Sequence, residues 1–137
     1  MKIIEDKNGR RVFDPTRKKY VALTPEEYVR QVFVEYLVGE KGYPLVNIKT
    51  EYELKFNNLS RRADIVIFNK GKILMIVECK AQKVQLDAKV LEQIWQYNYV
   101  LGAKYLTVTN LRRVFVCKVT EKGCDFLREF PSWDEIS

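Results

Sequence analysis

Two neighbouring apolar runs, "ADIVIF" (63–68) and "ILMIVECK" (73–80), constrain the fold more than any other part of the sequence. The four residues between them, Asn-Lys-Gly-Lys at 69–72, are typical of a tight turn between antiparallel strands. The second run is apolar on both faces, which predicts a central strand covered on both sides. We therefore expect a sheet built around this hairpin, with helices packed on it.

Further elements are predicted on both sides of the hairpin. Thr24 is a suitable N-cap for a helix that begins at Pro25, and Gly39 or Gly42 ends that helix. Alternation of apolar and charged residues predicts a half-exposed strand at 48–56. The remaining predictions are a second helix from about 87 to 101 and two strands within 104–110 and 113–119.

The length of 137 residues fits one domain. Within residues 1–137 we expect an N-terminal hairpin at 1–23, a core at 24–119 and a C-terminal tail at 120–137. The predicted class is α/β, with helices on a mixed sheet of four to five strands in the order αβββαβ. The tail is expected to dock as a short helix through its apolar residues, Phe126, Leu127, Phe130 and Trp133.

Composition excludes several kinds of chemistry. The sequence has no histidine, which removes Ser-His-Asp and Cys-His catalysis and histidine metal sites. Catalysis must therefore come from Asp, Glu, Lys, Tyr or a hard metal ion. The net charge of +6 permits a polyanionic partner without requiring one. Three cysteines without a CxxC spacing, no secretory signal and no bilayer-length apolar run predict a cytoplasmic protein without membrane contact.

Three charged residues lie at the ends of the two apolar runs: Asp64, Glu78 and Lys80. Side chains alternate along a strand, so Glu78 and Lys80 share a face, about 7 Å apart. Pairing through the 69–72 turn places Asp64 opposite Val77, next to Glu78. A small register shift or a bulge would align the two carboxylates, and the sequence leaves both alternatives open.

Two carboxylates this close repel each other, and a divalent cation such as Mg²⁺ would relieve that repulsion. A neighbouring ammonium group can orient a water molecule or contact a phosphate oxygen. The set of Asp64, Glu78 and Lys80 is thus typical of a phosphodiester-hydrolysing centre. The alternative is a salt bridge between Glu78 and Lys80 at a strand end, with Asp64 solvated.

These motifs resemble those of the PD-(D/E)XK nuclease superfamily. "RAD" at 62–64 stands for its Pro-Asp motif, "ECK" at 78–80 for its (D/E)XK motif, and thirteen residues separate Asp64 from Glu78. Ala63 replaces the proline, which is not a ligand. "QIWQY" places Gln93 and Tyr97 on one helix face and matches the Q-x-x-x-Y motif of one branch.

The sequence is still more similar to the N-terminal nuclease-like region of type I restriction enzyme R subunits and to its small free-standing relatives. Five blocks follow that family's order over roughly residues 12–119: "YVALTPEEYVRQ", "RRADIVIF", "VECKAQ", "LEQIWQYN" and "TVTN". The resemblance implies a Mg²⁺-dependent DNA endonuclease, with Mn²⁺ as a substitute, acting in restriction or another DNA defence or processing pathway. The chain has no P-loop, so a helicase or methyltransferase subunit would be encoded separately.

The resemblance also implies roles for individual residues. Asp64, Glu78 and the backbone carbonyl of Cys79 would ligate the metal, and Lys80 would position or activate the attacking water. Gln93 and Tyr97 would orient the lysine or hold the DNA phosphate. The alternative for that pair is a surface hydrogen bond beside a half-buried tyrosine.

The superfamily often adds a glutamate from the first helix. At 100° per residue, Glu26 falls about 60° from the centre of the predicted apolar face, whereas Glu27 and Glu35 fall well outside it. We therefore expect Glu26 at the site, with Arg30 as its partner or as a phosphate contact. The alternative role of Glu26 is to compensate the helix dipole.

Arg61 and Arg62 flank Asp64 and are the predicted phosphate contacts with DNA. Arg112 and Arg113 are among the basic residues expected to be general surface charge. Two other functions stay open: a non-catalytic nucleic-acid-binding module, and a partner subunit of a restriction-type assembly. Two cuts in a duplex would need two active sites, which a homodimer would supply.

Overall fold

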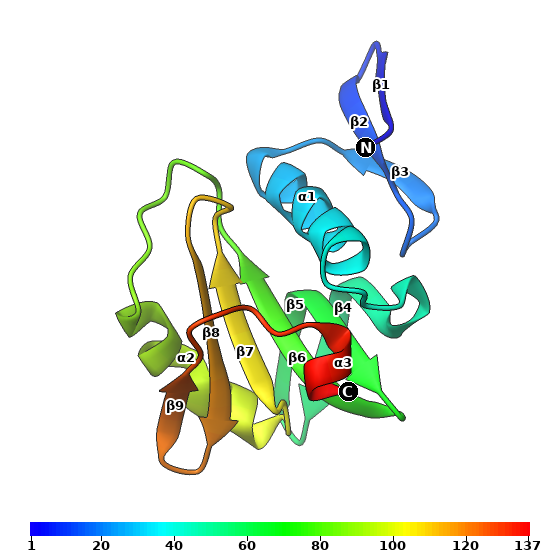
Figure 1. Ribbon diagram of the computed structural model, residues 1–137. Coiled ribbons are helices and arrows are strands. Elements are labelled where there is room, and N and C mark those ends of the chain that lie inside the picture. The colour runs from blue at the N-terminus through cyan, green and yellow to red at the C-terminus, as the bar shows by residue number, and fades with distance from the viewer.

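The chain forms two separate sheets in a computed structural model that describes residues 1–137 except for the side chain of Leu59 (Figure 1). The smaller sheet is antiparallel and stands beside α1, away from the main sheet. Its strands are β1 (Ile3–Asp6), β2 (Gly9–Asp14) and β3 (Lys19–Ala22). The predicted N-terminal hairpin is β2–β3. A third strand pairs with β2 across the turn that ends at Gly9, so the prediction of a hairpin alone is wrong.

The main sheet has six strands in the order β4-β5-β6-β7-β8-β9. They are β4 (Ile48–Phe56), β5 (Leu59–Asn69), β6 (Lys72–Cys79), β7 (Tyr105–Thr109), β8 (Val114–Thr120) and β9 (Gly123–Phe126). β6 and β7 pair in parallel and the other neighbours pair antiparallel. The predicted four to five strands become six because part of the tail turns at Gly123 and adds β9 to the edge.

The helices cover opposite faces of the main sheet. They are α1 (Pro25–Gly39), a short 3-10 helix η1 (Leu45–Asn47), α2 (Lys89–Val100) and α3 (Trp133–Ile136). One apolar cluster joins α1 and the C-terminal segment to β5 and β6, and another joins α2 to β7 and β8. In Figure 1 the red C-terminal segment crosses the near face of the sheet and α2 lies behind β8. The order αβββαβ runs from α1 to β7, as predicted.

Local chemistry explains the first helix and the hairpin. The Thr24 side chain accepts a hydrogen bond from the Glu27 backbone N–H at 3.0 Å, which caps α1 as predicted. Lys70 and Gly71 both have positive φ, at 52° and 77°, as a tight two-residue hairpin turn requires. The predicted turn between β5 and β6 is therefore confirmed.

The hairpin contains a β-bulge that decides the position of Asp64. Near the turn Phe68 pairs with Ile73, but beyond the bulge Ile67 pairs with Met75 and Ile65 with Val77. Val77 pairs with Ile65 rather than with Asp64, so Asp64 and Glu78 are the next residues beyond this last pair on the two strands. Of the alternatives that the sequence left open, the structure has the bulge.

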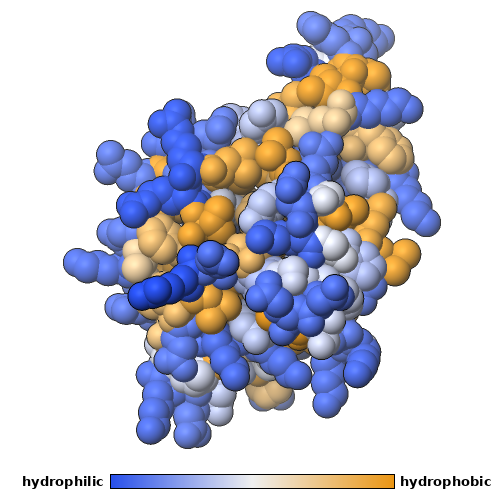
Figure 2. Space-filling view, in the orientation of Figure 1, coloured by the Kyte–Doolittle hydropathy of each residue, from blue (hydrophilic) through white to orange (hydrophobic). Residues whose placement is uncertain are grey.

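The C-terminal tail docks on the α1 face of the sheet. Phe130 is buried in the cluster with Phe33 and Tyr43, and Leu127 and Trp133 pack against that cluster. Phe126 is 43% exposed in the edge strand β9, so its predicted burial is wrong. Hydrophilic side chains cover the periphery of the face shown in Figure 2, and hydrophobic ones gather between them and on the small sheet. No helix of the described chain is long and apolar enough for a bilayer crossing.

Candidate functional site

Asp64 lies where the regular alternation of β5 breaks. Ala63 packs in the same cluster as Val66, whereas Ile65 packs on the opposite face of the sheet, toward α1. In a regular strand Ala63 and Ile65 would share a face. The neighbouring strand is distorted at the same level, because Glu51 of β4 has a φ of 49° and is skipped in the pairing between β4 and β5. This distortion presents Glu51 and Asp64 together to α1.

Arg30 of α1 joins three carboxylates. Its guanidinium forms ion pairs with Glu27, with Glu51 Oε1 at 2.5 Å and with Asp64 Oδ1 at 2.8 Å. The second oxygen of Asp64 accepts a hydrogen bond from the backbone N–H of Cys79 at 2.8 Å. Arg30 is buried, so its charge is balanced by these acids rather than by water. Asp64 is therefore held in place from both α1 and β6.

The glutamate of α1 that pairs with Arg30 is Glu27, not Glu26. Glu27 is 5% exposed and also accepts hydrogen bonds from Arg17 at 2.8 Å and from Gln31 at 3.0 Å. Glu26 is exposed and Arg30 pairs with Glu27, Glu51 and Asp64 instead, so the predicted pairing of Glu26 with Arg30 is wrong, whereas its place at the site stays a prediction. Gln31, to which the sequence gave no role, helps to hold Glu27.

The helical-wheel argument failed because α1 is covered on two sides. The prediction centred the buried face on residues that pack against the main sheet. Residues on the adjoining flank, Glu27, Gln31 and Val34, are buried as well. Arg17, in the turn after β2, contacts Glu27 on this flank, and residues of the small sheet line a hollow next to Gln31 and Val34. The second sheet was not foreseen, so neither was the second buried face.

Glu78 belongs to a separate group of contacts. Its Oε1 forms an ion pair with Arg61, and that buried oxygen accepts no hydrogen bond from the described residues. The Arg61 guanidinium lies over the ring of Tyr97 of α2, 5.0 Å from its centroid. The Tyr97 hydroxyl is buried without a hydrogen-bond partner in the same described set. The predicted pair of Glu78 and Tyr97 is thus connected through Arg61.

Three predicted site residues have exposed side chains: Arg62, Lys80 and Gln93. Arg62 lies 3.7 Å from Glu51 Oε2. Lys80 is fixed through its backbone, because its N–H donates to the Thr109 carbonyl at 2.9 Å, and its side chain forms no ion pair with the described residues. The Cys79 thiol is buried. Burial raises its pKa well above the ordinary value, and Asp64 raises it further.

The donor chemistry fits a hard divalent cation in part. Asp64 and Glu78 lie next to the last paired residues of two adjacent strands, although their side chains contact different arginines. Mg²⁺ commonly binds one or two carboxylates together with water and phosphate. Glu78 Oε1 is paired with Arg61, so a metal ion at this carboxylate would compete with that arginine. The described residues contain no group of three or more His, Cys, Asp or Glu side chains gathered around one metal position. Any ligands beyond two carboxylates would therefore come from backbone, water or substrate.

A family model decides the relationship of the chain. The model described as the N terminus of type I restriction enzyme R proteins (HSDR_N) matches residues 25–131. The chain belongs to this family. No curated protein matches the sequence significantly. The resemblance found in the sequence blocks is therefore confirmed.

Two solved structures share the fold of this HSDR_N member. A fragment of a protein proposed to be an HsdR subunit of a type I restriction enzyme from Vibrio vulnificus YJ016 has a TM-score of 0.61 at 22% identity. It covers 85% of the present chain, which spans only 25% of that chain. A protein from Anabaena variabilis, proposed to be a nuclease of the DUF820 group, has a TM-score of 0.52 at 13% identity. That match covers 97% of this chain and 86% of the other.

Sequence reasoning missed two carboxylates of this HSDR_N site, Glu27 and Glu51. Glu51 stands in an alternating strand among charged neighbours, and this pattern predicts an exposed side chain. Its positive φ turns it toward Arg30, and non-glycine residues adopt that conformation rarely. The spacing of Glu27, Arg30 and Gln31 along one flank of α1 was the available signal for the first of the two.

Proposed function

We propose that this chain is a Mg²⁺-dependent DNA endonuclease of the PD-(D/E)XK type. The observation that supports the proposal is that Asp64 and Glu78 directly follow the last pair of the bulged β5–β6 hairpin, Ile65 with Val77, and that Lys80 lies two residues further on, in a member of the HSDR_N family. A hydrolytic centre explains why one carboxylate lies in the middle of β5 and another near the end of β6. A purely structural hairpin has no need of them there.

Asp64, Glu78 and the Cys79 carbonyl would hold the metal ion. When bound, Mg²⁺ or Mn²⁺ would supply positive charge that stabilises the phosphate as it gains negative charge. The same two carboxylates are now neutralised by Arg30 and Arg61. A divalent cation competes with these arginines, and arginines released from the carboxylates are available to bind phosphate oxygens.

The remaining residues act on water and on the phosphate. Lys80, with its ammonium in solvent and its backbone fixed to β7, would orient the attacking water. The Tyr97 ring would support the Arg61 guanidinium, and the exposed amide of Gln93 would contact the DNA backbone. Glu27 takes the place first given to Glu26, and it acts by holding Arg30.

Calorimetry with Mg²⁺ and nicking of supercoiled plasmid test this function together. We expect wild-type protein to bind the metal and to nick DNA, and Asp64→Asn and Glu78→Gln to lose both properties. Lys80→Gln should bind Mg²⁺ normally and fail to cleave. Glu53→Gln, which removes an exposed carboxylate from β4, is the matched control and should behave as wild type.

A wild-type protein that binds Mg²⁺ and DNA but never cleaves would reject the endonuclease. The second candidate, a non-catalytic nucleic-acid-binding or partner subunit of a restriction-type assembly, would then apply. The pairing of both carboxylates with arginines of the same chain favours it. The chain also spans only a quarter of the Vibrio fragment, and a separately encoded helicase or methyltransferase subunit would be its partner in such an assembly. A homodimer would supply two sites for a double-strand cut.

A further inference from the structure

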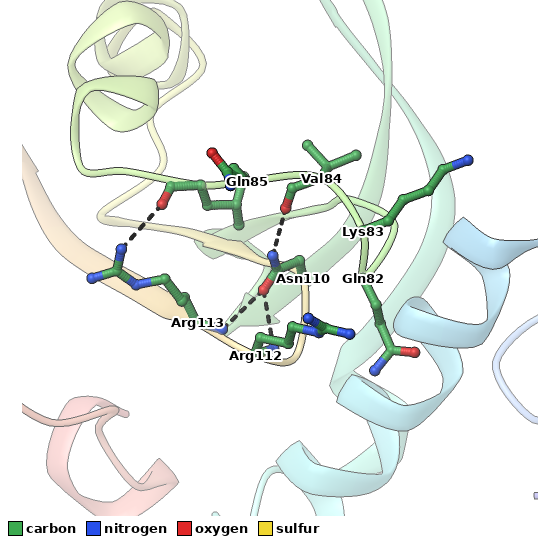
Figure 3. Close-up of a pocket in the computed structure, with 8 residues that line it drawn as sticks. Gln82, Lys83, Val84, Gln85, Asn110, Arg112 and Arg113 are labelled. Atoms are coloured by element: carbon green, nitrogen blue, oxygen red, sulfur yellow. Dashed lines mark hydrogen bonds between the residues drawn. The ribbon is translucent and has the colours of Figure 1, made fainter.

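A hollow of about 480 Å³ opens beside the carboxyl ends of the parallel strands β6 and β7. Two segments line it: residues 82–86, which follow β6, and the turn at 110–113, which follows β7 (Figure 3). The first segment begins two residues after Lys80. The second begins directly after Thr109, whose carbonyl accepts the Lys80 N–H. The hollow is therefore continuous with the proposed catalytic edge.

Asn110 holds the two walls of the hollow together. Its side-chain amide donates to the Val84 carbonyl at 2.7 Å, and its side-chain oxygen accepts the backbone N–H groups of Arg112 and Arg113 at 3.0 and 2.9 Å. Asn110 is 3% exposed, so these bonds are shielded from water. The sequence block "TVTN" ends at Asn110 and had no assigned role. These hydrogen bonds give Asn110 the role of joining the two segments that line the hollow.

The lining is basic and polar. It contains Lys83, Arg112 and Arg113, the amides of Gln82 and Gln85, and no carboxylate. Arg113 is already engaged, because it donates to the Leu86 carbonyl at 3.3 Å and lies over the ring of Phe115. Arg112 and Lys83 have exposed side chains and form no ion pair within the part of the chain that the structure describes.

The orientation of these side chains favours an extended anion. Figure 3 shows the Arg112 guanidinium directed toward Gln82, on the side where α1 lies, while Lys83 extends away from the turn. Gln82 and Lys83 also line a second hollow with Pro25 and Tyr28 at the start of α1. The two basic groups thus lie on the side of the hollow that adjoins the start of α1.

We propose that this hollow is a phosphate-binding subsite for the DNA strand next to the cleaved bond, with Arg112 and Lys83 as its phosphate contacts. The inference rests on the proposed function and specifies how that site holds its substrate. It revises the sequence-based interpretation of Arg112 as general surface charge. Asn110 is a positioning residue here, since it fixes the backbone of Arg112.

The test is fluorescence anisotropy of a short fluorescein-labelled duplex at several salt concentrations, with Asp64→Asn protein so that no cleavage intervenes. Combining Arg112→Gln with Lys83→Gln should weaken binding roughly tenfold and lower the slope of log K against log salt by about two, because two phosphate contacts disappear. In protein that keeps Asp64, the combined Arg112→Gln and Lys83→Gln substitutions should raise KM for DNA cleavage and leave kcat unchanged. Lys118→Gln with Lys122→Gln removes two exposed charges at the opposite end of β7 and β8 and should leave the slope unchanged.

The two proposals fail in different ways. If the wild-type protein cleaves DNA but the Arg112 and Lys83 changes do not alter the salt slope of binding, the subsite is overturned and the nuclease is retained. No DNA binding by the Asp64→Asn protein at low salt would overturn the subsite as well. If the wild-type protein does not cleave DNA, but the Arg112 and Lys83 changes lower the DNA affinity and the salt slope as expected, the nuclease is rejected and the subsite is retained. Asn110→Ala should reproduce the weaker binding while circular dichroism shows an intact fold.

Discussion

Arg30 is the residue on which the acidic groups of the site converge. Burial disfavours its charged form, but the hydrogen bond to Asp64 and the nearby Glu27 and Glu51 raise the pKa of its guanidinium above the ordinary value. Arg30 is thus a permanent internal cation. It prevents three neighbouring carboxylates from repelling one another and keeps Asp64 oriented in the absence of any other cation.

Replacing Glu27 with Gln should destabilise the protein by about 3 kcal/mol. The change leaves the buried Arg30 and the partly exposed Arg17 without a shared carboxylate, and breaking a buried ion pair costs this much. Urea unfolding measures the effect. Glu26→Gln is the control and should change stability by less than about 0.5 kcal/mol, because Glu26 is exposed. Equal losses in both variants would contradict the assignment of Glu27.

Replacing Arg61 with Gln should tighten Mg²⁺ binding about threefold. Arg61 competes with the metal for Glu78, and a partly exposed ion pair contributes only about 0.2–1 kcal/mol. Calorimetry on the variant and on wild type gives the comparison. Arg62→Gln, which removes a more exposed arginine of the same strand, should leave the affinity unchanged. Weaker binding in Arg61→Gln would show that Arg61 supports the metal site rather than competing for it.

At the scale of elements, the junction between the small sheet and the main sheet is polar. Asp14, at the end of β2, accepts hydrogen bonds from Thr50 of β4 at 2.5 Å and from Arg17 at 2.6 Å. Burial alone would raise the pKa of Asp14, but the bonds from Thr50, Arg17 and Thr16 outweigh it and lower that pKa to about 2. Arg17 also forms an ion pair with Glu27, so two ion pairs through Arg17 connect Asp14 of the small sheet to Glu27.

Acidification should weaken this junction between about pH 4 and pH 2. The folded-state pKa of Asp14 lies below its ordinary value of 3.8, so the stabilisation by Asp14 is complete above that value and is lost as the pH falls through about 2. The loss amounts to about 2 kcal/mol. Unfolding curves over this range should show the stability gap between wild type and Asp14→Asn closing as the pH falls. Asp125→Asn, at an exposed position, should give a constant gap.

Elements with a strong local signal were predicted well, and elements made by long-range pairing were not. The cap at Thr24 and the turn at Lys70 and Gly71 depend on neighbouring residues, and both were identified from the sequence. The strands β1 and β9 form because they pair with the edge strands β2 and β8. Each has only four residues, which is too short for a clear strand pattern in the sequence. Asp64 and Glu78 were placed by spacing. Glu51 was not, because its backbone departs from its strand.

At the scale of the whole molecule, the C-terminal segment closes the core that α1 and the main sheet begin. Phe130 contacts the rings of Phe33, Tyr36 and Tyr43, and the Tyr43 hydroxyl donates to the Pro131 carbonyl at 3.0 Å. Residues far apart in the sequence thus share one apolar cluster. Stability of the site side of the sheet therefore depends on the end of the chain.

Phe130→Ala should lower the free energy of unfolding by about 3–4 kcal/mol, since it removes a buried aromatic ring and leaves a cavity. Denaturant titration should show one transition with an unchanged slope, as expected for a segment that belongs to the cooperative unit. Phe126→Ala, at the exposed phenylalanine of the same segment, should cost less than about 1 kcal/mol. A separate early transition in Phe130→Ala would show that the tail unfolds independently.

The bulge in the β5–β6 hairpin has a consequence for how this sequence can vary. The extra residue at Leu74 shifts the pairing of β6 with β5 by one residue. The position of Glu78 relative to Asp64 therefore depends on the number of residues between the bulge and the site. The loop at Lys70 and Gly71 lies outside that interval. Homologous chains can therefore have a longer or shorter loop and keep the relative position of the two acids. A single insertion between Met75 and Glu78 would shift Glu78 by one residue relative to Asp64 and turn its side chain to the other face of the sheet.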